Sequence, residues 1–593
     1  MPVCDDAPRS GGPAIREQSS HDPVGTPDRR SQPLVGAAPA SKAELGNDRA
    51  GRLLDVAIVL ALAVAAYLTR HGGLPTDGLW HDDAWVATGA VWGGFSELIT
   101  VGSGHPGFTG LLMIVARLPG GSETLAYPAF AAGVVGPAAL YLALRVFGIA
   151  RSISALLGSA LVASWVHILY SGRVKSYVVD IVIVLAVALL LPYLARLYWR
   201  WSTALAWVVI SIVLGFFSGF ALIATAIAGA LLVLQPSTER PSPEAPASDR
   251  LVRIGAVATQ AVAFLGLFAW LQRSSDLAEI ETAQEENYDG HLDFALNPLS
   301  YGADIADHFG KVAEVFPIGG VDWPSAEWLP LLAALIAVIG LVGGILVPRW
   351  RLTSSFFLAI VVFAIVGASV GKFPFGPSGG SFFSRGERAT LWLVPIMAFG
   401  VALALEWLRS RFAGRTILRA GFDLVVGVLA VVIVVHALGK PTTAYPLPGM
   451  ESAMQFIESE ATDDDAIILT PVTVFPASVE ASSGIVLEPR PEEGVPYVPD
   501  FDNDRVLPLS VPVDPASLPA SITQVADGAE RVFVVNALPG FTRIIERSIN
   551  QRLRAEGFEP SESETFETPV VTIWSRGSLD DRRPSEISGS SAG

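Results

Sequence analysis

The sequence predicts a polytopic α-helical membrane protein with about eleven transmembrane helices and a C-terminal extracytoplasmic α/β domain. Three observations support this fold class. Of the 593 residues, 51% are hydrophobic and only 16% are charged, which is too apolar for an ordinary soluble protein. Apolar runs long enough to cross a bilayer recur between Leu53 and Leu438. The part after residue 440 is different, because it holds 25 Asp or Glu and 10 Arg and so carries −15 of the total charge of −17.

These shifts in composition divide the chain into four parts. Residues 1–50 are rich in Pro, Ser, Gly and Ala without an apolar core, which predicts a disordered cytoplasmic tail and no signal peptide. Residues 51–438 form the transmembrane domain, residues 439–576 the extracytoplasmic domain, and residues 577–593 a second disordered tail. The acidic balance argues against a nucleic-acid partner. Cys4 is the single cysteine, which excludes an intrachain disulfide and a cysteine-based metal site.

The apolar runs predict eleven spans, with a break near Gly215–Gly219 in a run that is too long for one helix. The predicted spans are Leu53–Thr69, Leu125–Phe147, Ser152–Tyr170, Tyr177–Ala195, Ser202–Phe216, Gly219–Leu234, Arg253–Leu271, Leu329–Val347, Thr353–Val370, Ala389–Trp407 and Gly421–Leu438. The stretch Gly107–Leu118 is too short to cross and predicts an interfacial or re-entrant helix.

Charge bias predicts the orientation of these spans. With a cytoplasmic N-terminus, every internal loop carries arginine, as the positive-inside rule requires. The protein is then a multi-pass protein of the plasma (inner) membrane, with its C-terminal domain outside. Residues 70–124 become the first external loop, and the external loops are longer than most internal ones. We therefore expect function on the outer face.

The C-terminal part mixes helical and strand patterns, which predicts a small α/β domain. The expected helices are Met450–Glu460 and Phe541–Glu556, and the expected strands are Ala466–Leu469, Val532–Val535 and Val570–Trp574.

The first candidate site is the adjacent pair Asp82 and Asp83, flanked by Trp80 and Trp85 just after the first span. Charged groups at a membrane boundary are costly and are often functional. Adjacent acids can hold a divalent cation such as Mg²⁺, Mn²⁺ or Zn²⁺, or one can act as a general base while the other orients it. An alternative is that an acid of this pair caps the helix that begins near Ala84.

Two further motifs belong to the outer boundary. His105 precedes Pro106, which fixes a turn at the start of the interfacial helix; His105 could bind a metal, a phosphate or a sugar hydroxyl, or could merely cap the helix. Arg173 and Lys175 lie between two spans, where a guanidinium fork and an ammonium can clamp a phosphate. Snorkelling to lipid headgroups is the alternative for both cations.

A fourth motif places Arg388 at the outer end of a late span, where it could reach a lipid phosphate, while its neighbours Arg385 and Glu387 could instead pair locally. The chain has no phosphate-binding Gly-Lys-Ser/Thr loop, no Gly-x-Ser-x-Gly elbow and no His-Glu-x-x-His motif. Nucleotide-driven transport and serine hydrolysis therefore lack their usual sequence support.

The order of these motifs resembles the GT-C superfamily of membrane glycosyltransferases, in the group of protein O-mannosyltransferases and aminoarabinose transferases. That group has an Asp-Glu-type pair in the first external loop, a His-Pro-Pro-type turn, a Tyr-Ser-x-x-x-Arg-x-Tyr-type boundary and a basic residue before a late span. The corresponding residues here are Asp82-Asp83, His105-Pro106-Gly107, Tyr170-Ser171 with Lys175 and Tyr177, and Arg388. The resemblance covers residues 53–195 by motif and the later spans by layout only.

The chain also departs from this pattern. Asp83 stands where Glu is commoner, Gly107 replaces a proline, Lys175 stands where Arg is usual, and Arg173 stands where an acid is common. These departures leave the identity of the substrate open.

The resemblance implies transfer of a sugar from a polyprenyl-phosphate-linked donor to a cell-envelope acceptor outside the membrane. It implies that Asp82 or Asp83 is the catalytic base, that Arg173, Lys175 and Arg388 hold the donor phosphate, and that His105, Tyr177 and Trp85 contact substrate, with membrane lipids as further partners. Trp85 could instead be an interfacial anchor. Two other functions stay open: a transporter or flippase of a lipid-linked or anionic substrate, and a catalytically inactive scaffold for envelope assembly.

Overall fold

The computed structural model describes residues 42–95, 98, 105–235, 246–274, 298–314, 328–369, 390–440, 449–481, 484–488, 497–509, 517–537, 543–566 and 568–577. The remaining residues, which include most of both predicted tails, lie outside this description. The chain divides into two units, residues 1–55 and 56–593, and the division falls inside helix α1 (Lys42–Arg70). Helix α1 extends into the stretch 1–50 that we predicted to be disordered, so residues 42–50 correct that prediction. Ala, Glu, Leu, Lys and Arg are good helix formers and favour this extension.

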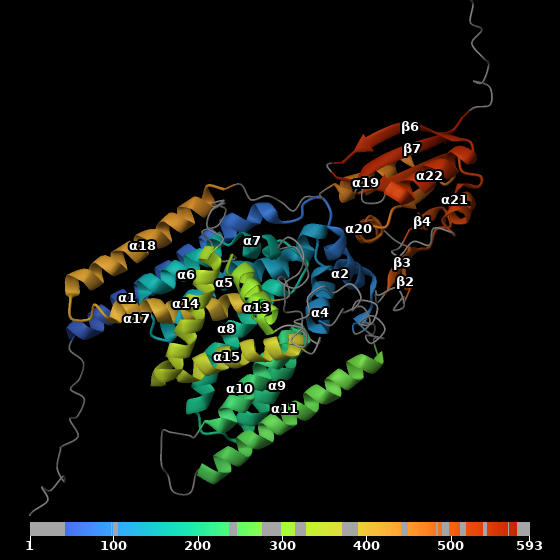
Figure 1. Cartoon of the computed structure of the whole chain (residues 1–593). Helices are drawn as coiled ribbons and strands as arrows, with labels where there is room; N and C mark the ends of the chain where they lie inside the picture. Colours follow the sequence, from blue (N-terminus) through green and yellow to red (C-terminus); the bar gives the residue numbers. More distant parts are fainter. Residues whose placement is uncertain are drawn as a thin grey trace, which may run out of the picture. The chain divides into compact units, whose positions relative to one another are not determined.

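Most of the described helices between α1 and residue 438 are apolar, and each of the eleven predicted spans overlaps one or two of them (Figure 1). They are α1, α5 (Ser122–Val146), α6 (Arg151–Ala163), α7 (Trp165–Ser171), α8 (Tyr177–Arg196), α9 (Trp201–Phe217), α10 (Gly219–Leu234), α11 (Pro246–Ser274), α14 (Trp328–Leu346), α15 (Pro348–Ser369), α17 (Leu393–Ser410) and α18 (Thr416–Leu438). In the described part of the chain, eight helices are long and apolar enough to cross a membrane, or nine if the bent pair α6 and α7 is one span. The protein is therefore a multi-pass membrane protein. Helices α9 and α10 have only 17 and 16 residues, so the count of eleven stays a prediction.

Two of the predicted helix boundaries are informative. The predicted break near Gly215–Gly219 is confirmed, because α9 ends at Phe217 and Ser218 caps α10 by accepting a hydrogen bond from the backbone N–H of Ala221. The predicted span Ser152–Tyr170 is not one straight helix. It bends by 58° between α6 and α7, and Ser164 caps α7 by accepting from the backbone N–H of His167.

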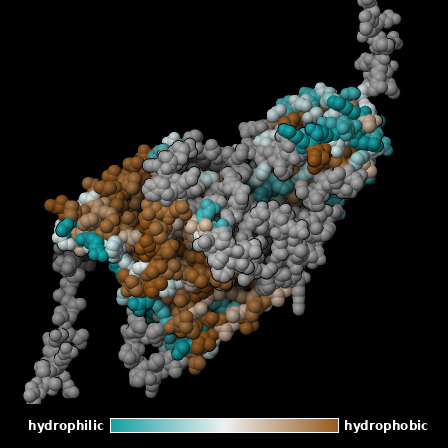
Figure 2. All heavy atoms as spheres, in the orientation of Figure 1, coloured by the Kyte–Doolittle hydropathy of each residue, from teal (hydrophilic) through white to brown (hydrophobic). Residues whose placement is uncertain are grey.

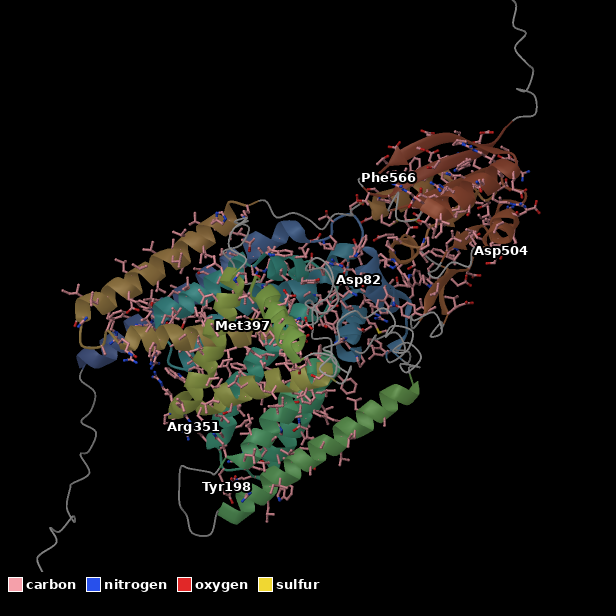
Figure 3. The ribbon with its side chains drawn as sticks, in the orientation of Figure 1. Asp82, Tyr198, Arg351, Met397, Asp504 and Phe566 are labelled. Carbon is pink, nitrogen blue, oxygen red and sulfur yellow. The ribbon has the colours of Figure 1, made fainter. Side chains whose placement is uncertain are left out.

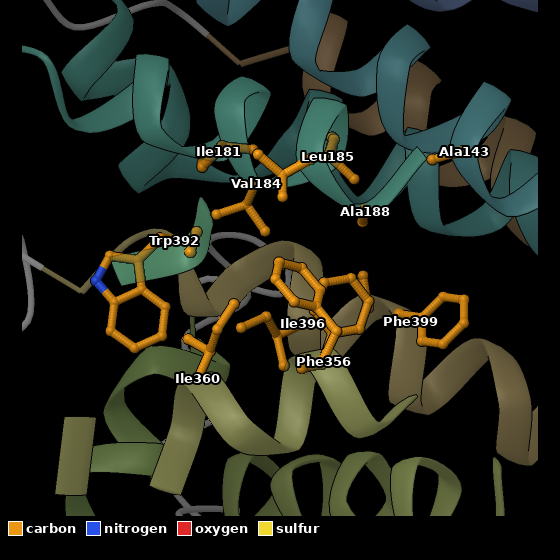
Figure 4. Packing of buried hydrophobic residues seen from close by; sticks show 14 of the residues in the cluster. Ala143, Ile181, Val184, Leu185, Ala188, Phe356, Ile360, Trp392, Ile396 and Phe399 are labelled. Atoms are coloured by element: carbon orange, nitrogen blue, oxygen red, sulfur yellow. The ribbon is translucent and has the colours of Figure 1, made fainter. Parts of the chain in front are cut away.

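Buried apolar side chains from α8, α15 and α17 form the centre of the helical part (Figure 4). Val184 and Leu185 of α8 face Phe356 of α15 and Ile396 of α17 in this cluster. Inside a membrane, such contacts stabilise the fold mainly through van der Waals packing, because lipid is as apolar as the core.

Small residues let α14 and α17 approach closely. A Cβ atom added at Gly340 would lie 1.9 Å from the carbonyl oxygen of Gly400, and one added at Gly400 would lie 2.2 Å from the carbonyl oxygen of Ala337. Glycine at both positions therefore permits backbone-to-backbone contact between the two helices, as is common in membrane bundles.

In the described residues, the segments that we predicted to be external contain three further helices. Helix α2 (His81–Trp92) and helix α4 (Pro106–Val115) belong to the predicted first external loop, and α4 matches the predicted interfacial helix with proline at its start. The amphipathic helix α13 (Pro298–Glu314) was not predicted, and it packs against α14 and α17.

The C-terminal part is a small α/β domain, as predicted, and the coloured part of the face that Figure 2 shows is mostly hydrophilic. Its main sheet has the strand order β4-β1-β5-β7-β6. Strand β1 pairs in parallel with β4 and β5, β7 pairs antiparallel with β5, and β6 pairs antiparallel with β7. The strands are β1 (Ala466–Leu469), β4 (Val506–Pro508), β5 (Arg531–Asn536), β6 (Phe558–Thr565) and β7 (Val570–Arg576). A second, two-stranded sheet pairs β2 (Ile485–Glu488) with β3 (Val498–Phe501).

The helices of this domain are α19 (Met450–Glu460), α20 (Val474–Glu480), α21 (Leu518–Ala526) and α22 (Arg543–Ala555). The predicted helix Met450–Glu460 and strand Ala466–Leu469 are confirmed residue for residue. The short helix α20 and strands β2 to β4 escaped prediction because segments of three to seven residues carry too little periodicity.

Candidate functional site

The acidic pair lies in the first turn of α2 (Figure 3). Trp80 occupies the N-cap position and makes no side-chain capping hydrogen bond, so the alternative in which an acid caps this helix is wrong. Asp82 and Asp83 instead lie near the positive end of the helix dipole, which favours their charged forms.

The loop between α7 and α8 brings two cations onto this pair. The Nε atom of Arg173 donates a hydrogen bond to Oδ2 of Asp83. The Nζ atom of Lys175 donates to Oδ1 of Asp82 at 3.3 Å, and Nη2 of Arg173 lies 3.9 Å from Oδ2 of Asp82. We call these four residues the charged cluster. The structure thus joins the predicted base residues to two of the predicted phosphate-binding residues, and their formal charges cancel.

The two acids of the charged cluster differ in exposure. The side chain of Asp83 is 3% exposed and that of Asp82 is 26% exposed. Burial raises the pKa of the Asp83 carboxyl, and the positive charges of Arg173 and Lys175 offset part of this rise. The Oδ1 atom of Asp83 is buried and has no hydrogen-bond partner in the described part of the chain. Asp83 is therefore an internal partner of Arg173, whereas Asp82 can reach a bound molecule.

Aromatic residues flank the charged cluster. The Nζ atom of Lys175 lies 5.3 Å from the ring centroid of Trp85, within the range of a cation–π contact. Tyr177 is the first residue of α8, and its ring meets the ring of Tyr170 edge-on at 5.2 Å. We call the loop 172–176, which carries Arg173 and Lys175, the cationic loop. The structure therefore brings Trp85 to the charged cluster and places Tyr177 at the end of the cationic loop.

The other two predicted residues do not lie on these elements. His105 immediately precedes α4, which packs against α2, α5 and α9. A Cβ atom added at Gly107 would lie 2.9 Å from the backbone of Phe216, so α4 approaches the end of α9 closely. Arg388 and its neighbours Arg385 and Glu387 lie outside the described residues.

Glycine at position 172 fixes the course of the cationic loop. A Cβ atom at Gly172 would lie 2.2 Å from the carbonyl oxygen of Gly73, in the short 3₁₀ helix η1 (His71–Gly73) that follows α1. Only glycine lets the two backbones approach this closely. The loop that carries Arg173 is thus held against the end of the first helix.

Sequence reasoning missed a set of contacts between α2 and the C-terminal domain. The hydroxyls of Thr88 and Ser478 are 2.8 Å apart, and Nε1 of Trp92 donates to the carbonyl oxygen of Ser478 at 2.6 Å. The hydroxyl of Tyr497 donates to the carbonyl oxygen of Trp85. These partners are roughly 390 to 410 residues apart, so no local pattern could have revealed them. Helix α20 and Tyr497 thereby fix the helix that carries the acids.

His81 lies between the acidic pair and α20. Its ring meets the ring of Phe475 edge-on at 5.5 Å. Burial lowers the pKa of His81, and the negative charge of Asp82 offsets part of this change. His81 therefore places an aromatic contact with α20 directly beside Asp82 in sequence.

A second group of acids comes from the segment between η1 and α2 and from α19 and α20. The carboxylate of Asp77 accepts hydrogen bonds from the backbone N–H and the hydroxyl of Ser452, each at 2.9 Å. Burial, and after it the negative charges of Glu451 and Asp77, raise the pKa of Glu480 to about 8.

The acidic pair was also predicted as a possible site for a divalent metal. No three His, Cys, Asp or Glu side chains in the described ranges converge as a metal site would require. Asp82 and Asp83 already have cationic partners, which compete with a metal for the carboxylate oxygens. We therefore derive no chemical step through a metal.

No protein-family model matches this chain, and no curated protein matches it. Among solved structures, the chain is similar to ArnT from Cupriavidus metallidurans in the apo state, with 12% identity, a TM-score of 0.49 and coverage of 89% of this chain and 98% of that one. ArnT bound to undecaprenyl phosphate gives 13% identity, a TM-score of 0.49 and coverage of 88% and 98%. A mutant of the arabinofuranosyltransferase AftD from Mycobacteria gives 14% identity, a TM-score of 0.42 and coverage of 88% of this chain but 41% of that one.

Proposed function

We propose that the protein is a GT-C-like glycosyltransferase that moves a sugar from a polyprenyl-phosphate-linked donor to an extracytoplasmic acceptor. The observation that carries this proposal is the charged cluster, in which two carboxylates and two cations from distant segments meet beside Trp85. The ordered motifs that resemble the GT-C superfamily supply the donor class. A carboxylate for the acceptor and cations for a phosphate are the two groups that this reaction needs.

The two acids have different roles, since Asp82 is the general base and Asp83 orients a cation. Asp82 is the more exposed acid, so its carboxylate takes the proton of the acceptor hydroxyl. The acceptor oxygen attacks the anomeric carbon with inversion, the bond from that carbon to the phosphate oxygen breaks, and polyprenyl phosphate leaves with the electron pair. Asp83 orients Arg173 and does not meet the substrate.

The two cations stabilise the charge that grows on the leaving phosphate. The Nε atom of Arg173 is engaged by Asp83, but its Nη2 atom lies beyond hydrogen-bond distance of Asp82. A guanidinium has five donor hydrogens and an ammonium has three, so both can serve a phosphate while they keep their carboxylate partners. Each well-placed donor contributes about 3 kcal/mol to stabilising the transition state.

The remaining assignments complete this proposal. Trp85, Tyr177 and His105 contact the sugar or the prenyl chain, and Arg388 adds a third cation for the phosphate. The protein lies in the plasma (inner) membrane, surrounded by lipids, with a cytoplasmic N-terminus and an external C-terminal domain. The acceptor is a glycan, lipid or protein of the cell envelope.

A transporter is the second candidate, and one observation favours it. Helices α6 and α7 form a broken span with a bend of 58°, beside the buried guanidinium of Arg70. Broken helices with charged groups beside them are features of transporters. A transporter moves a lipid-linked substrate without releasing polyprenyl phosphate, which separates the two functions.

The test uses the full chain in lipid nanodiscs with a panel of polyprenyl-phosphate sugars and cell-envelope acceptors. Release of polyprenyl phosphate is measured for the wild type and for the Asp82→Asn and Lys175→Met variants. Each substitution is expected to lower the rate by about 100-fold or more. The matched control is Asp504→Asn, which removes an exposed acid of the C-terminal domain and should leave the rate unchanged.

Release from one donor that is lost in both variants and kept in the control would support the proposal. No release from any donor by folded protein would overturn it. Movement of labelled lipid across liposomes without release would then identify the transporter, and absence of both activities would leave the scaffold function.

A further inference from the structure

Arg70 is the last residue of α1, and it is completely buried. Arginine at the end of a transmembrane helix commonly reaches the aqueous boundary by snorkelling. Arg70 points instead into the protein, where its guanidinium lies at the break between α6 and α7. Burying such a charge is expensive unless hydrogen bonds compensate it.

The guanidinium binds both sides of this break. On the α6 side, Nη2 donates to the carbonyl oxygen of Leu161 at 3.0 Å and Nη1 donates to that of Val162 at 3.3 Å. These carbonyl groups belong to the last turn of α6, where the helix leaves its acceptors unsatisfied and its dipole is negative. On the α7 side, Nη2 lies 2.6 Å from Nδ1 of His167, and Nε donates to the hydroxyl of Ser171 at 3.2 Å.

The chemistry of arginine fixes the direction of the contact with His167. A guanidinium has donors only, so Nδ1 of His167 must accept and its ring proton must lie on Nε2. The hydroxyl of Ser171 accepts from Arg70 and donates to the carbonyl oxygen of His167. One side chain of α1 therefore sets the orientation of both ends of α7.

Helix α7 leads directly into the cationic loop. Ser171 is its last residue and lies two positions before Arg173. A Cβ atom at Gly133 would lie 2.0 Å from the hydroxyl of Ser171, so α5 closes the other side of this residue. Gly172 packs on Gly73, three residues after Arg70. Arg70 and Gly73 thus contact two successive residues, Ser171 and Gly172, where α7 leads into the loop.

We propose that Arg70 is a positioning residue that holds the α6–α7 break and thereby aims Arg173 and Lys175 at the donor phosphate. The part of this role that concerns the donor phosphate rests on the proposed function. The part in which Arg70 holds the α6–α7 break and the following loop does not. Lysine cannot replace arginine here, because one ammonium cannot bind carbonyl groups of α6 and side chains of α7 in a planar fork.

The experiment compares the wild type with Arg70→Lys in nanodiscs by two measurements. The first is amide hydrogen exchange of peptides that cover residues 171–176, and the second is the dissociation constant for polyprenyl phosphate. In Arg70→Lys we expect exchange to be about tenfold faster and binding about tenfold weaker. The binding constant is measured on folded protein, so a smaller folded fraction does not change it.

Two further variants sharpen the test. Ser171→Ala removes one acceptor of Arg70 and leaves the guanidinium in the break, so it should change both quantities in the same direction by a smaller factor. It also keeps the test decisive if Arg70→Lys fails to fold. The matched control is Arg196→Lys, an exposed arginine that ends α8, which should change neither quantity.

Unchanged exchange at residues 171–176 in the variants would overturn the proposal, as would faster exchange with unchanged binding. If the wild type itself does not bind polyprenyl phosphate, the proposed function fails at that point. The exchange measurement still decides in that case whether Arg70 holds the loop.

Discussion

The Nε atom of Arg173 donates a hydrogen bond to Oδ2 of Asp83, across 90 residues of sequence. Both side chains are almost completely buried, at 6% and 3% exposure. The pair joins the first turn of α2 to the loop before α8, and so converts two separate motifs into one site. Its geometry makes several predictions.

Substitutions in the buried pair of Asp83 and Arg173 should change the stability of the protein and its activity independently. Asp83→Leu leaves the buried guanidinium of Arg173 without its carboxylate, which costs about 3 to 5 kcal/mol. The double variant Asp83→Leu/Arg173→Met replaces both charges by apolar groups and should recover most of the lost melting temperature, while it remains inactive. Thermal unfolding and polyprenyl phosphate release are measured in parallel. A double variant as unstable as the single one would show that the pair is not a compensated buried charge pair.

The close approach of Gly172 to Gly73 predicts that Gly172→Ala inactivates the protein. The added methyl group would lie 2.2 Å from a backbone oxygen, so the loop with Arg173 and Lys175 must move. Release of polyprenyl phosphate should fall at least about tenfold, in line with the sensitivity of catalysis to small displacements. Gly219→Ala is the control, because a Cβ atom there meets nothing within 4 Å. Equal activity of the two variants would contradict this prediction.

The hydrogen bonds between α20 and α2 predict that the C-terminal domain stabilises the helix that carries the acidic pair. Thr88→Val keeps the shape of the side chain but removes its hydrogen bonds to Ser478 and to the carbonyl oxygen of Phe475. We expect a loss of about 1 to 2 kcal/mol in the free energy of unfolding. A double-mutant cycle with Ser478→Ala measures the coupling. Strictly additive effects of the two substitutions would show that the hydroxyls do not interact.

The buried acid Glu480 predicts a loss of stability as the pH rises towards about 8. Its pKa rises from 4.5 to about 8, first through burial and then through the charges of Glu451 and Asp77. Folding therefore favours the protonated form, and this contribution to stability is complete below about pH 4.5 and lost as the pH rises through about 8. The melting temperature of the wild type should fall between about pH 4.5 and pH 8 and change little through this group above pH 8.

Glu480→Gln provides the control for this titration. The amide is neutral at every pH, so the variant should show a shallower decline in melting temperature than the wild type. Parallel curves for the two proteins would assign the decline to other groups.

Much of the fold could be predicted because its signals are local. The apolar runs locate the helices, and the alternation after residue 440 predicts the α/β domain with helix Met450–Glu460 in place. The candidate site was predicted in pieces, since Asp82, Asp83, Arg173 and Lys175 all stand at span boundaries where charge is costly.

The pairing of these pieces could not be predicted, because it depends on tertiary contacts. Nothing in the sequence indicates that the predicted phosphate-binding cations pair with the predicted base. Arg70 was missed because an arginine after an apolar run reads as an ordinary helix end, and its burial depends on a bend at Ser164 that the run Ser152–Tyr170 conceals. Arg388 stays a prediction, since it lies outside the described residues.

The hydroxyl contact between Thr88 and Ser478 spans 390 residues, and this separation sets a time for the assembly of the site. At a synthesis rate of roughly 5 to 20 residues per second, Ser478 leaves the ribosome about 20 to 80 seconds after Thr88. During that interval α2 lacks its hydrogen bonds to α20. The site therefore gains its full set of contacts only after the C-terminal domain has been synthesised and folded.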